Sequence, residues 1–275
     1  MAHSQSMTVI LRRLFQFLFC LGTLFLCLFL AMFLTLWSVP YLVFWIDRTD
    51  YPDSLSQGMR ISCTAYAEAY ELPEAPLLEC WDTGLLRQEL VRSVDETFHQ
   101  MGPGRSSPFD SLVEQGVFSS ADQEKASAAC QELSALWHKA IQTPFSNLLN
   151  LFMQYRRIAP GLMCLFLPLA LGSLAMLYAT SANLRALATC LLPASQTLLL
   201  CGVLIPAASA LLWSRWSWVP AESLASTLFR CWSTGFFFCW ALITLSAGLF
   251  CLLLGAHWNR VSSPMRPAKI RRRTE

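Results

Sequence analysis

The sequence predicts an all-α polytopic membrane protein with four transmembrane helices and a large helical extracytoplasmic segment between the first and second helices. Two observations lead to this fold class. The chain contains four long runs without a charged residue, and its charges are divided unevenly between segments. Only 14% of the 275 residues are charged, whereas an average soluble domain has roughly 25%. The composition is therefore typical of a protein that lies in a lipid bilayer.

The first uncharged run covers Leu14 to Ile46. About 20 apolar residues in a helix cross a hydrocarbon core, so we predict a first transmembrane helix at 14–37, after a cytoplasmic N-terminal segment at 1–13. The run is too long for the apolar region of a cleavable signal peptide, and no small-x-small cleavage motif follows it. Pro40 and four aromatic residues are expected at the far membrane interface, where Trp and Tyr are enriched. The aromatic residues are Trp37, Tyr41, Phe44 and Trp45.

Three further uncharged runs occur later, and each can hold one spanning helix. They predict transmembrane helices at 158–180, 190–213 and 232–256. The turn from Ser181 to Arg185 is short, so the second and third helices should form an antiparallel hairpin. Residues 214–230 are predicted to be a short outer loop and 257–275 a basic cytoplasmic tail. The cores of the four predicted spans contain no Asp, Glu, Lys, Arg or His. This absence argues against a proton-coupled transporter, an intramembrane protease or a voltage sensor.

The charges predict the orientation. Residues from Asp47 to Tyr155 include 16 acidic and 7 basic side chains, a net of −9, whereas the remainder has 2 acidic and 13 basic, a net of +11. If the N terminus is cytoplasmic, nine Lys and Arg lie near helix ends on the inner side and six on the outer side. The positive-inside rule then predicts that both termini are cytoplasmic. The topology-setting residues are Arg12, Arg13, Arg185, Arg271, Arg272 and Arg273.

Residues 38–157 are predicted to form an acidic, helical extracytoplasmic segment. An amphipathic helix is predicted from Cys80 to Met101, because apolar residues recur there at three- and four-residue spacings. These residues are Trp81, Leu85, Val91, Val94, Phe98 and Met101. Ser107, with Asp110 three residues later, predicts a helix start, and that helix should end near Gly116. Another helix should start at Ser119 or Ser120 and reach Pro144, with one apolar stripe. The stripe consists of Ala126, Cys130, Leu133, Trp137 and Ile141.

These apolar stripes could pack on one another or dock a partner. Trp81, Phe98 and Trp137 are the largest residues on them. Self-packing is the favoured interpretation, because 109 residues can bury a modest core.

Eleven cysteines occur, and eight lie in the predicted spans, where they are interpreted as small packing residues. The other three are Cys63, Cys80 and Cys130. In an oxidising compartment one pair could close and one thiol would remain. Cys80 with Cys130 is the first candidate for a disulfide, and Cys63 with Cys80 is the alternative. No C-x-x-C motif is present, so a thioredoxin-like redox relay is not predicted.

No motif predicts catalysis, a cofactor or a metal. The chain lacks G-x-S-x-G, P-loop and G-x-G-x-x-G patterns, and its four histidines do not stand at metal-ligand spacing. We therefore predict a protein that is not an enzyme and needs no cofactor. An enzyme acting on lipid or peptidoglycan would need a polar cluster near an interface, and four residues could supply one. They are Asp47, Asp50, Asp53 and Arg156.

Small residues on the last span predict a helix-packing face. Ala247, Cys251 and Gly255 recur every four residues, which permits two helices to approach closely. Direct nucleic-acid binding is not expected, because the basic residues are scattered and no zinc-finger, RNP or helix-turn-helix pattern occurs. The predicted partners are the lipid bilayer and other membrane proteins of a complex, with self-association as a further possibility.

The second and third predicted spans carry a resemblance to a known family. Arg157 precedes the second span, Leu167-Pro168-Leu169 lies within it, Leu184-Arg185 forms the turn, and Ser195 follows. In these residues the chain resembles the four-span inner-membrane proteins encoded on integrative conjugative elements and conjugative plasmids. The order of one span, a helical extramembrane segment and three spans is also similar. The sequence departs from the family between Gln196 and Leu200, which is apolar instead of basic.

The resemblance implies an accessory or assembly subunit of conjugative DNA transfer or secretion in a bacterial inner membrane, with no catalytic residue to assign. Two alternatives remain open. One is an oligomeric channel or transporter. The other is a claudin-like tetraspan interaction protein, which has four spans and a large first outer loop. That loop is a small sheet with a Trp and two nearby Cys, whereas the segment here has a helical pattern and no N-x-[ST] sequon.

Overall fold

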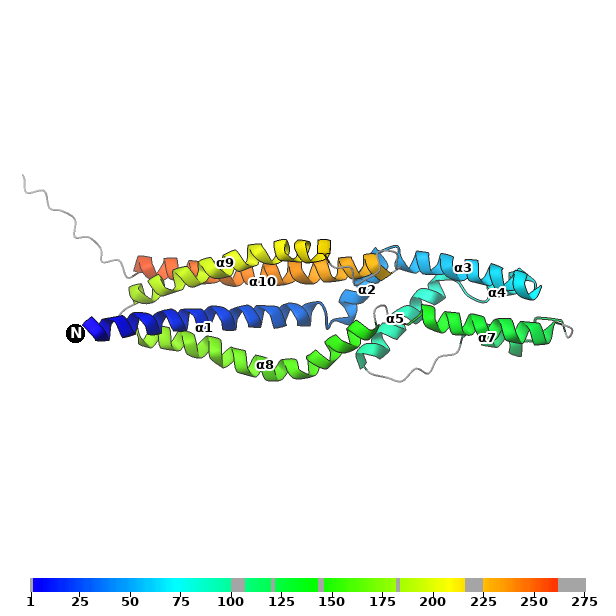
Figure 1. The fold of residues 1–275 in the computed structure, drawn as a ribbon, viewed down its shortest axis with the longest axis horizontal. Helices are drawn as coiled ribbons and strands as arrows, with labels where there is room; N and C mark the ends of the chain where they lie inside the picture. Colours follow the sequence, from blue (N-terminus) through cyan, green and yellow to red (C-terminus); the bar gives the residue numbers. More distant parts are fainter. Residues whose placement is uncertain are drawn as a thin grey trace, which may run out of the picture. The chain divides into compact units, whose positions relative to one another are not determined.

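The computed structural model describes residues 2–99, 107–119, 122–142, 146–181, 184–215 and 225–261, and their regular structure is entirely helical (Figure 1). Four of the helices are long and apolar enough to cross a membrane, as judged by length and composition: Thr8–Leu34, Leu148–Ala179, Leu184–Leu211 and Ser226–Val261. The prediction of an all-α membrane protein with four spanning helices is confirmed. A claudin-like layout requires a sheet in the first large loop, and the described residues of that segment contain no strand.

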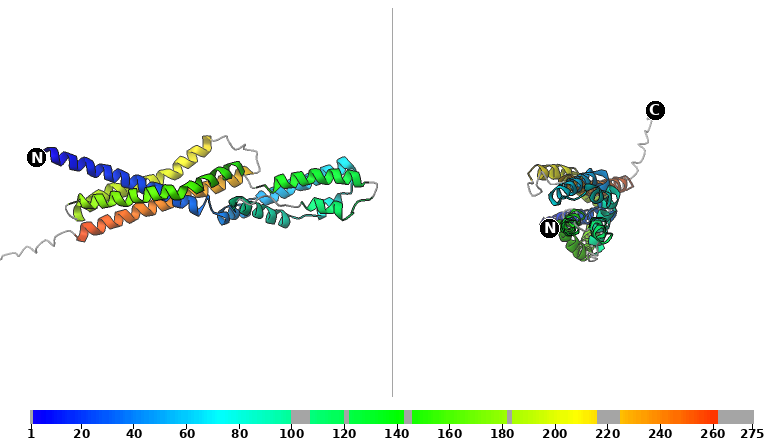
Figure 2. Two further views of the ribbon diagram at one scale, coloured as in Figure 1. Left: turned by 90° about the horizontal axis from the view of Figure 1, so that it is seen from below. Right: turned by 90° about the vertical axis from the view of Figure 1, so that its right-hand side faces the viewer.

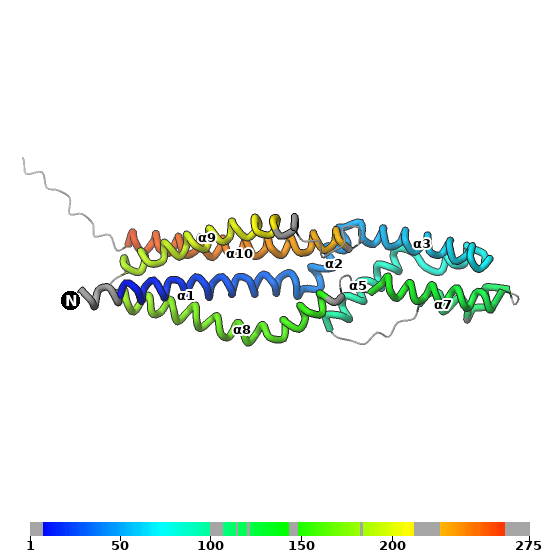
Figure 3. Tube along the Cα trace, in the orientation of Figure 1, coloured from blue at the N-terminus to red at the C-terminus, as the bar shows by residue number. Residues whose placement is uncertain are grey.

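The chain divides into two compact units, and Figure 3 traces its path through them. The first unit contains residues 1–32, 158–214 and 237–275, and the second contains 33–157 and 215–236. Helices α1 (Ala2–Leu34), α8 (Ser146–Ala179) and α10 (Ala225–Val261) each contribute residues to both units. We call the first the spanning unit and the second the helical unit.

The spanning unit consists of α9 (Leu184–Arg215) and the apolar parts of α1, α8 and α10, which run roughly along one another (Figure 2). Its buried cluster joins residues from all four helices: Phe19, Leu177, Leu187, Cys190, Leu191, Ala194, Leu198 and Cys251. Leu177 before the α8–α9 turn and Leu187 after it lie in this cluster, as the predicted hairpin requires. The phenyl rings of Phe25 and Phe166 stack with centroids 4.4 Å apart.

The helices extend beyond most of the predicted span ends. Helix α8 begins at Ser146, before the predicted start at 158, and α9 begins at Leu184 instead of 190. Hydropathy indicates where a helix can lie in lipid, but a helix continues wherever the backbone bonds are satisfied. The prolines at 160, 168, 193 and 206 lie inside α8 and α9 without ending either helix.

The first helix ends three residues earlier than predicted, at Leu34, and a separate helix α2 (Val39–Arg48) follows. Pro40 lies in the first turn of α2. Because proline has no backbone N–H to leave unpaired in a first turn, this position suits the start of α2. The sequence analysis missed α2, although Ser38 at the N-cap followed by proline is a recognised helix start.

The helical unit contains α2, α3 (Tyr51–Tyr70), α4 (Glu74–Glu79), α5 (Thr83–His99), α6 (Pro108–Glu114) and α7 (Gln123–Ala140). The first turns of α8 and α10 also belong to it. Trp37 donates its indole N–H to the carbonyl of Phe152 at 2.9 Å. The hydroxyl of Tyr41 donates to the carbonyl of Trp232 at 3.1 Å. These two bonds attach the chain around α2 to α8 and α10 within this unit.

The predicted helix start at Ser107 is confirmed. The Ser107 hydroxyl accepts from the backbone N–H of Phe109 at 3.2 Å, and an Asp110 carboxylate oxygen accepts from the backbone N–H of Ser107 at 3.0 Å. This reciprocal arrangement is a capping box. The predicted starts at Cys80 and Ser119 were too early by about one turn. Asp82 instead caps α5 by accepting from the N–H of Leu85 at 2.6 Å.

The apolar face of α5 also differs from the predicted one. Leu86, Leu90 and Val94 are fully buried, at spacings of four residues. The predicted stripe included Val94 and Phe98 but relied on Leu85 and Val91, which are only half-buried. The α7 stripe, in contrast, is buried at every predicted position. Residues 101–106, Pro144, most of the predicted outer loop and the tail after Val261 lie outside the described residues.

Two backbone positions with positive φ lead to a prediction. Gly116 has φ +61°, and a Cβ added there would meet no atom within 4 Å. Gly116→Ala should therefore destabilise the helical unit by about 1 kcal/mol through backbone strain alone. Glu71, at the end of α3, has φ 58° without being glycine. Glu71→Gly should instead stabilise the helical unit, because glycine adopts a positive φ without strain. Thermal unfolding of the full chain in detergent measures both changes. Gly58→Ala is the control, because an added Cβ there would meet no atom within 4 Å and the backbone does not have a positive φ.

Candidate functional site

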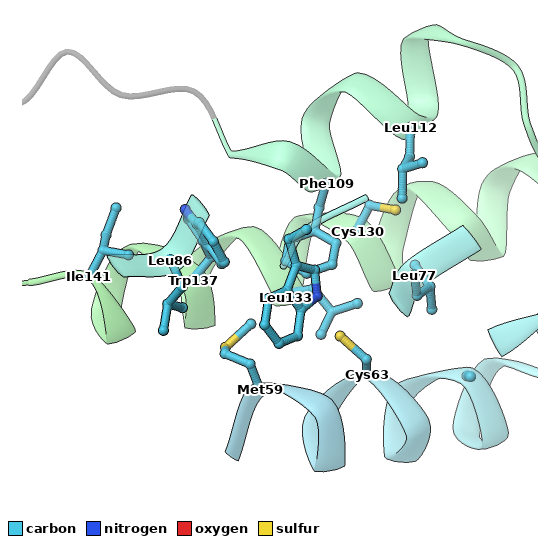
Figure 4. Packing of buried hydrophobic residues seen from close by; sticks show 12 residues of the cluster. Met59, Cys63, Leu77, Leu86, Phe109, Leu112, Cys130, Leu133, Trp137 and Ile141 are labelled. Carbon is cyan, nitrogen blue, oxygen red and sulfur yellow. The ribbon is translucent and has the colours of Figure 1, made fainter. Parts of the chain in front are cut away.

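The helical unit has its own hydrophobic core, which we call the α3–α7 core (Figure 4). Helices α3, α4, α5, α6 and α7 each contribute to it. Its buried members are Met59, Cys63, Ala67, Leu77, Trp81, Leu86, Phe109, Leu112, Cys130, Leu133, Trp137 and Ile141. The apolar stripes predicted from the sequence therefore pack on one another, which confirms the favoured interpretation.

Trp137 is the largest side chain in the centre of this core. It is fully buried, and its ring lies 6.0 Å from that of Trp81 and 6.2 Å from that of Phe109, measured between centroids. Aromatic pairs at such separations contribute beyond their buried area. The indole nitrogens of Trp81 and Trp137 are buried without a hydrogen-bond partner. The core is thus held by apolar packing and not by a polar network.

The three cysteines outside the predicted spans converge on this core. Cys63 on α3 and Cys130 on α7 are buried members, and Cys80 at the end of α4 packs against them. All three are free thiols in the structure. Burial raises the pKa of Cys80 to about 12 and that of Cys130 to about 11. Burial also raises the pKa of Cys63.

The surface of the helical unit is strongly charged. Every Asp, Glu, Lys, Arg and His side chain that the structure describes is at least partly exposed. Asp47 pairs with Arg87 and Glu71 pairs with Lys125, and these ion pairs link different elements, whereas Arg92 pairs with Glu89 and Glu96 within α5. The carboxylates predicted from the sequence are therefore mostly a solvated acidic face.

The carboxylates considered for an enzymatic role do not form a cluster with Arg156. Asp47 pairs with Arg87, Asp50 is the N-cap residue of α3, and Asp53 lies in the first turn of that helix. Arg156 is an exposed residue of α8, and the ion pairs among the described residues include none between it and these carboxylates. Within the described part of the chain, no group of three or more His, Cys, Asp or Glu could hold a metal ion.

Asp47 and Arg87 form a bidentate ion pair between α2 and α5. The Nε of Arg87 lies 2.7 Å from one carboxylate oxygen, and its Nη2 lies 2.8 Å from the other. Both side chains are well exposed, so the pair should stabilise the unit by less than about 1 kcal/mol. A double-mutant cycle of Asp47→Asn and Arg87→Gln, followed by chemical unfolding at low and high salt, should give a small coupling energy that salt reduces. A coupling unaffected by salt would contradict this account.

The predicted helix-packing residues lie on the face of α10 that meets α9. Cys251 is a member of the buried cluster, and a Cβ added at Gly255 would lie 3.6 Å from the carbonyl oxygen of Ala188. Ala247 is half-buried. A closer approach than at Gly255 lies next to Ala247, at Gly248, where an added Cβ would lie 3.0 Å from the backbone nitrogen of Leu199. The sequence pattern missed Gly248 and its counterpart Gly202.

The predicted topology-setting residues have different environments. Arg12 is half-buried and donates from its guanidinium to the carbonyl of Thr180. Arg13 and Arg185 are exposed. Beside them, Gln16 donates to the carbonyl of Cys190 at 2.9 Å, a bond between α1 and α9 that the sequence analysis did not anticipate. Arg271, Arg272 and Arg273 lie outside the described residues.

No protein-family model, curated protein or solved structure matches this chain. The function must therefore be inferred from the composition of the spans, the packing of the helical unit and the character of its surface.

Proposed function

We propose that this chain is a non-enzymatic integral membrane subunit that assembles with other membrane proteins in a conjugation or secretion apparatus of a bacterial inner membrane. Residues 38–157 lie outside the cytoplasm, and both termini lie inside. The four spanning helices support this arrangement, because an even number of spans returns the chain to its starting side. The excess of Lys and Arg near the inner helix ends gives the orientation.

One observation carries the proposal: the helical unit buries its apolar side chains within itself and presents charge outside. Trp81, Phe98 and Trp137 are 5%, 4% and 0% exposed. The segment from Asp47 to Tyr155 carries a net charge of −9. A folded surface of this kind suits charge-matched contact with a basic face of another protein, which favours correct orientation and rapid association.

The resemblance in the second and third spans supports a role in conjugation. It rests on Arg157, the Leu167-Pro168-Leu169 triplet, Leu184-Arg185 and Ser195. In the structure Arg157 and the triplet lie on α8, whereas Leu184, Arg185 and Ser195 lie on α9, so Leu184-Arg185 begins a helix instead of forming the predicted turn. The family implies an accessory subunit and not a catalytic one.

An oligomeric channel or transporter is the alternative function. Prolines inside α8 and α9 are the feature that favours it, because broken helices form binding sites in many transporters. Both helices remain continuous through their prolines, so we prefer the assembly function.

Site-specific photo-crosslinking in cells tests the proposal. A crosslinker at Ile61, which is 63% exposed on α3, should capture the same neighbouring membrane protein in repeated preparations, and one at the buried Leu133 should capture none. The purified chain in liposomes should not conduct ions. Crosslinks only between copies of this chain, together with conductance, would favour the channel and contradict the proposal.

A further inference from the structure

Four arginines gather at one end of the spanning unit, where α1 begins, α8 is followed by α9 and α10 ends (Figure 1). They are Arg12, Arg13, Arg185 and Arg260, and we call them the arginine band. Each lies near the end of a helix that is long and apolar enough to cross a membrane. In a bilayer such positions lie close to the lipid headgroups, which long arginine side chains can reach.

Two side-chain hydrogen bonds give the register of α1 against α9. The amide of Gln16 donates to the carbonyl of Cys190 at 2.9 Å, and the thiol of Cys20 donates to the carbonyl of Ala194 at 3.8 Å. Both bonds join residues that are 174 positions apart. The two helices therefore run in the same direction with a constant offset.

The same offset, continued by one turn toward the start of both helices, places Arg12 level with Ala186, which directly follows Arg185 on α9. The guanidinium of Arg12 also donates to the carbonyl of Thr180 at the end of α8. Arg12 therefore lies where three helices meet. Arg13 and Arg185 are exposed at the same level.

The end of α10 reaches this level from the opposite direction. A Cβ added at Gly248 would lie 3.0 Å from the backbone nitrogen of Leu199, and one added at Gly255 would lie 3.6 Å from the carbonyl oxygen of Ala188. Later residues of α10 thus meet earlier residues of α9, so the two helices are antiparallel. Arg260, which is exposed in the last turn of α10, therefore lies at the level of the first turn of α9.

The described part of the spanning unit supplies no carboxylate to the arginine band. It contains no Asp or Glu, and none of the ion pairs among the described residues of the chain includes one of the four arginines. Arg12 is half-buried, and its Nε is buried without a hydrogen-bond partner, which is costly for a cation. Arg185 lies in the first turn of α9, where the helix dipole favours an anion and not a cation. The band is therefore a cationic cluster that an external anion would stabilise.

We propose that the arginine band binds the phosphate group of an anionic phospholipid at the membrane surface where α8 is followed by α9. Guanidinium groups present planar pairs of N–H donors that match phosphate oxygens, and basic pockets between spanning helices bind anionic headgroups. A zwitterionic phospholipid also has a phosphate, but its ammonium group offsets the attraction, so the site selects lipids with a net negative charge. The site depends on the four helices crossing a membrane and not on which end faces the cytoplasm.

Native mass spectrometry of the full chain, released from nanodiscs that contain equal amounts of phosphatidylglycerol and phosphatidylcholine, tests the site. We expect the chain to retain phosphatidylglycerol in preference to phosphatidylcholine. Arg13→Gln combined with Arg185→Gln should weaken this preference by about fivefold for each arginine removed, and lysine at both positions should keep part of it. The matched control is Arg60→Gln, an exposed arginine of α3 in the helical unit, which should retain phosphatidylglycerol as the wild type does.

Equal retention of the two lipids by the wild type overturns the proposal, and so does an unchanged preference in the double glutamine variant. Excess inorganic phosphate should leave the lipid bound. Displacement of the lipid by phosphate would show a site for a soluble anion and would also overturn the proposal. Because Arg13 and Arg185 are exposed, the double variant should keep the wild-type midpoint of thermal unfolding. If it does not, the comparison of the two lipids on the wild-type chain still decides.

Discussion

Replacing Trp137 with alanine is expected to lower the free energy of unfolding of the helical unit by about 3–5 kcal/mol. The side chain is fully buried and packs against the rings of Trp81 and Phe109. Its removal leaves a large cavity at the point where α3, α5, α6 and α7 meet. Hydrogen exchange of the full chain, followed by mass spectrometry, measures the effect as faster exchange in peptides from these helices.

The matched control for this substitution is Ile61→Ala on α3. Ile61 is 63% exposed, so its truncation should change exchange only slightly. Because the spanning unit has its own buried cluster, exchange in peptides from its helices should be less affected. If Trp137→Ala leaves the protection of α3 and α7 at the wild-type level, the residues of the α3–α7 core do not form a cooperative unit.

Replacing Gly248 with leucine is expected to separate α9 from α10. A single Cβ at this position would already lie 3.0 Å from both the backbone nitrogen and Cγ of Leu199. Overpacking of this kind costs about 1–3 kcal/mol and occasionally more, and the backbone of α9 cannot move away as a side chain can. The midpoint of thermal aggregation in detergent should fall markedly for Gly248→Leu and less for Gly248→Ala.

Two other glycines provide controls within the same unit. At Gly172 on α8 an added Cβ would meet nothing within 4 Å, so Gly172→Leu should be tolerated. At Gly202 an added Cβ would lie 2.6 Å from Cγ of Leu245 and 3.2 Å from its backbone nitrogen, so Leu245 must move to admit it. Gly202→Ala should therefore also be destabilising, unlike Gly172→Leu. An equal effect of leucine at Gly172 and at Gly248 would show that the close approach of α9 and α10 is not important for stability.

The spanning helices could be predicted from the sequence because lipid imposes a simple requirement on them. Every backbone polar group in the bilayer core must be bonded within the helix, and about 20 apolar residues must follow one another. The capping box at Ser107 and the α7 stripe were also predictable, since local spacing determines both. Short helices such as α2 and α4 were not recognised, because ten and six residues provide too little periodicity.

The arrangement within each unit could not be predicted, because it depends on contacts between distant parts of the chain. Cys63 and Cys130 are 67 positions apart, and only the packing of α3 on α7 brings them into one core. Small residues at four-residue spacing indicated the correct face of the last helix. They did not identify Gly248, because this close approach depends on how the Leu199 turn of α9 is placed against it.

Reporter fusions to the full chain test the central claim most directly. One reporter is active only outside the cytoplasm and the other only inside, and each is attached after Gln142 or after Glu275. We predict external activity after Gln142 and cytoplasmic activity after Glu275, with all of the protein in the membrane fraction. Cytoplasmic activity after Gln142, or a chain that remains in the high-speed supernatant of a detergent-free lysate, would contradict a four-span protein with an extracytoplasmic helical unit.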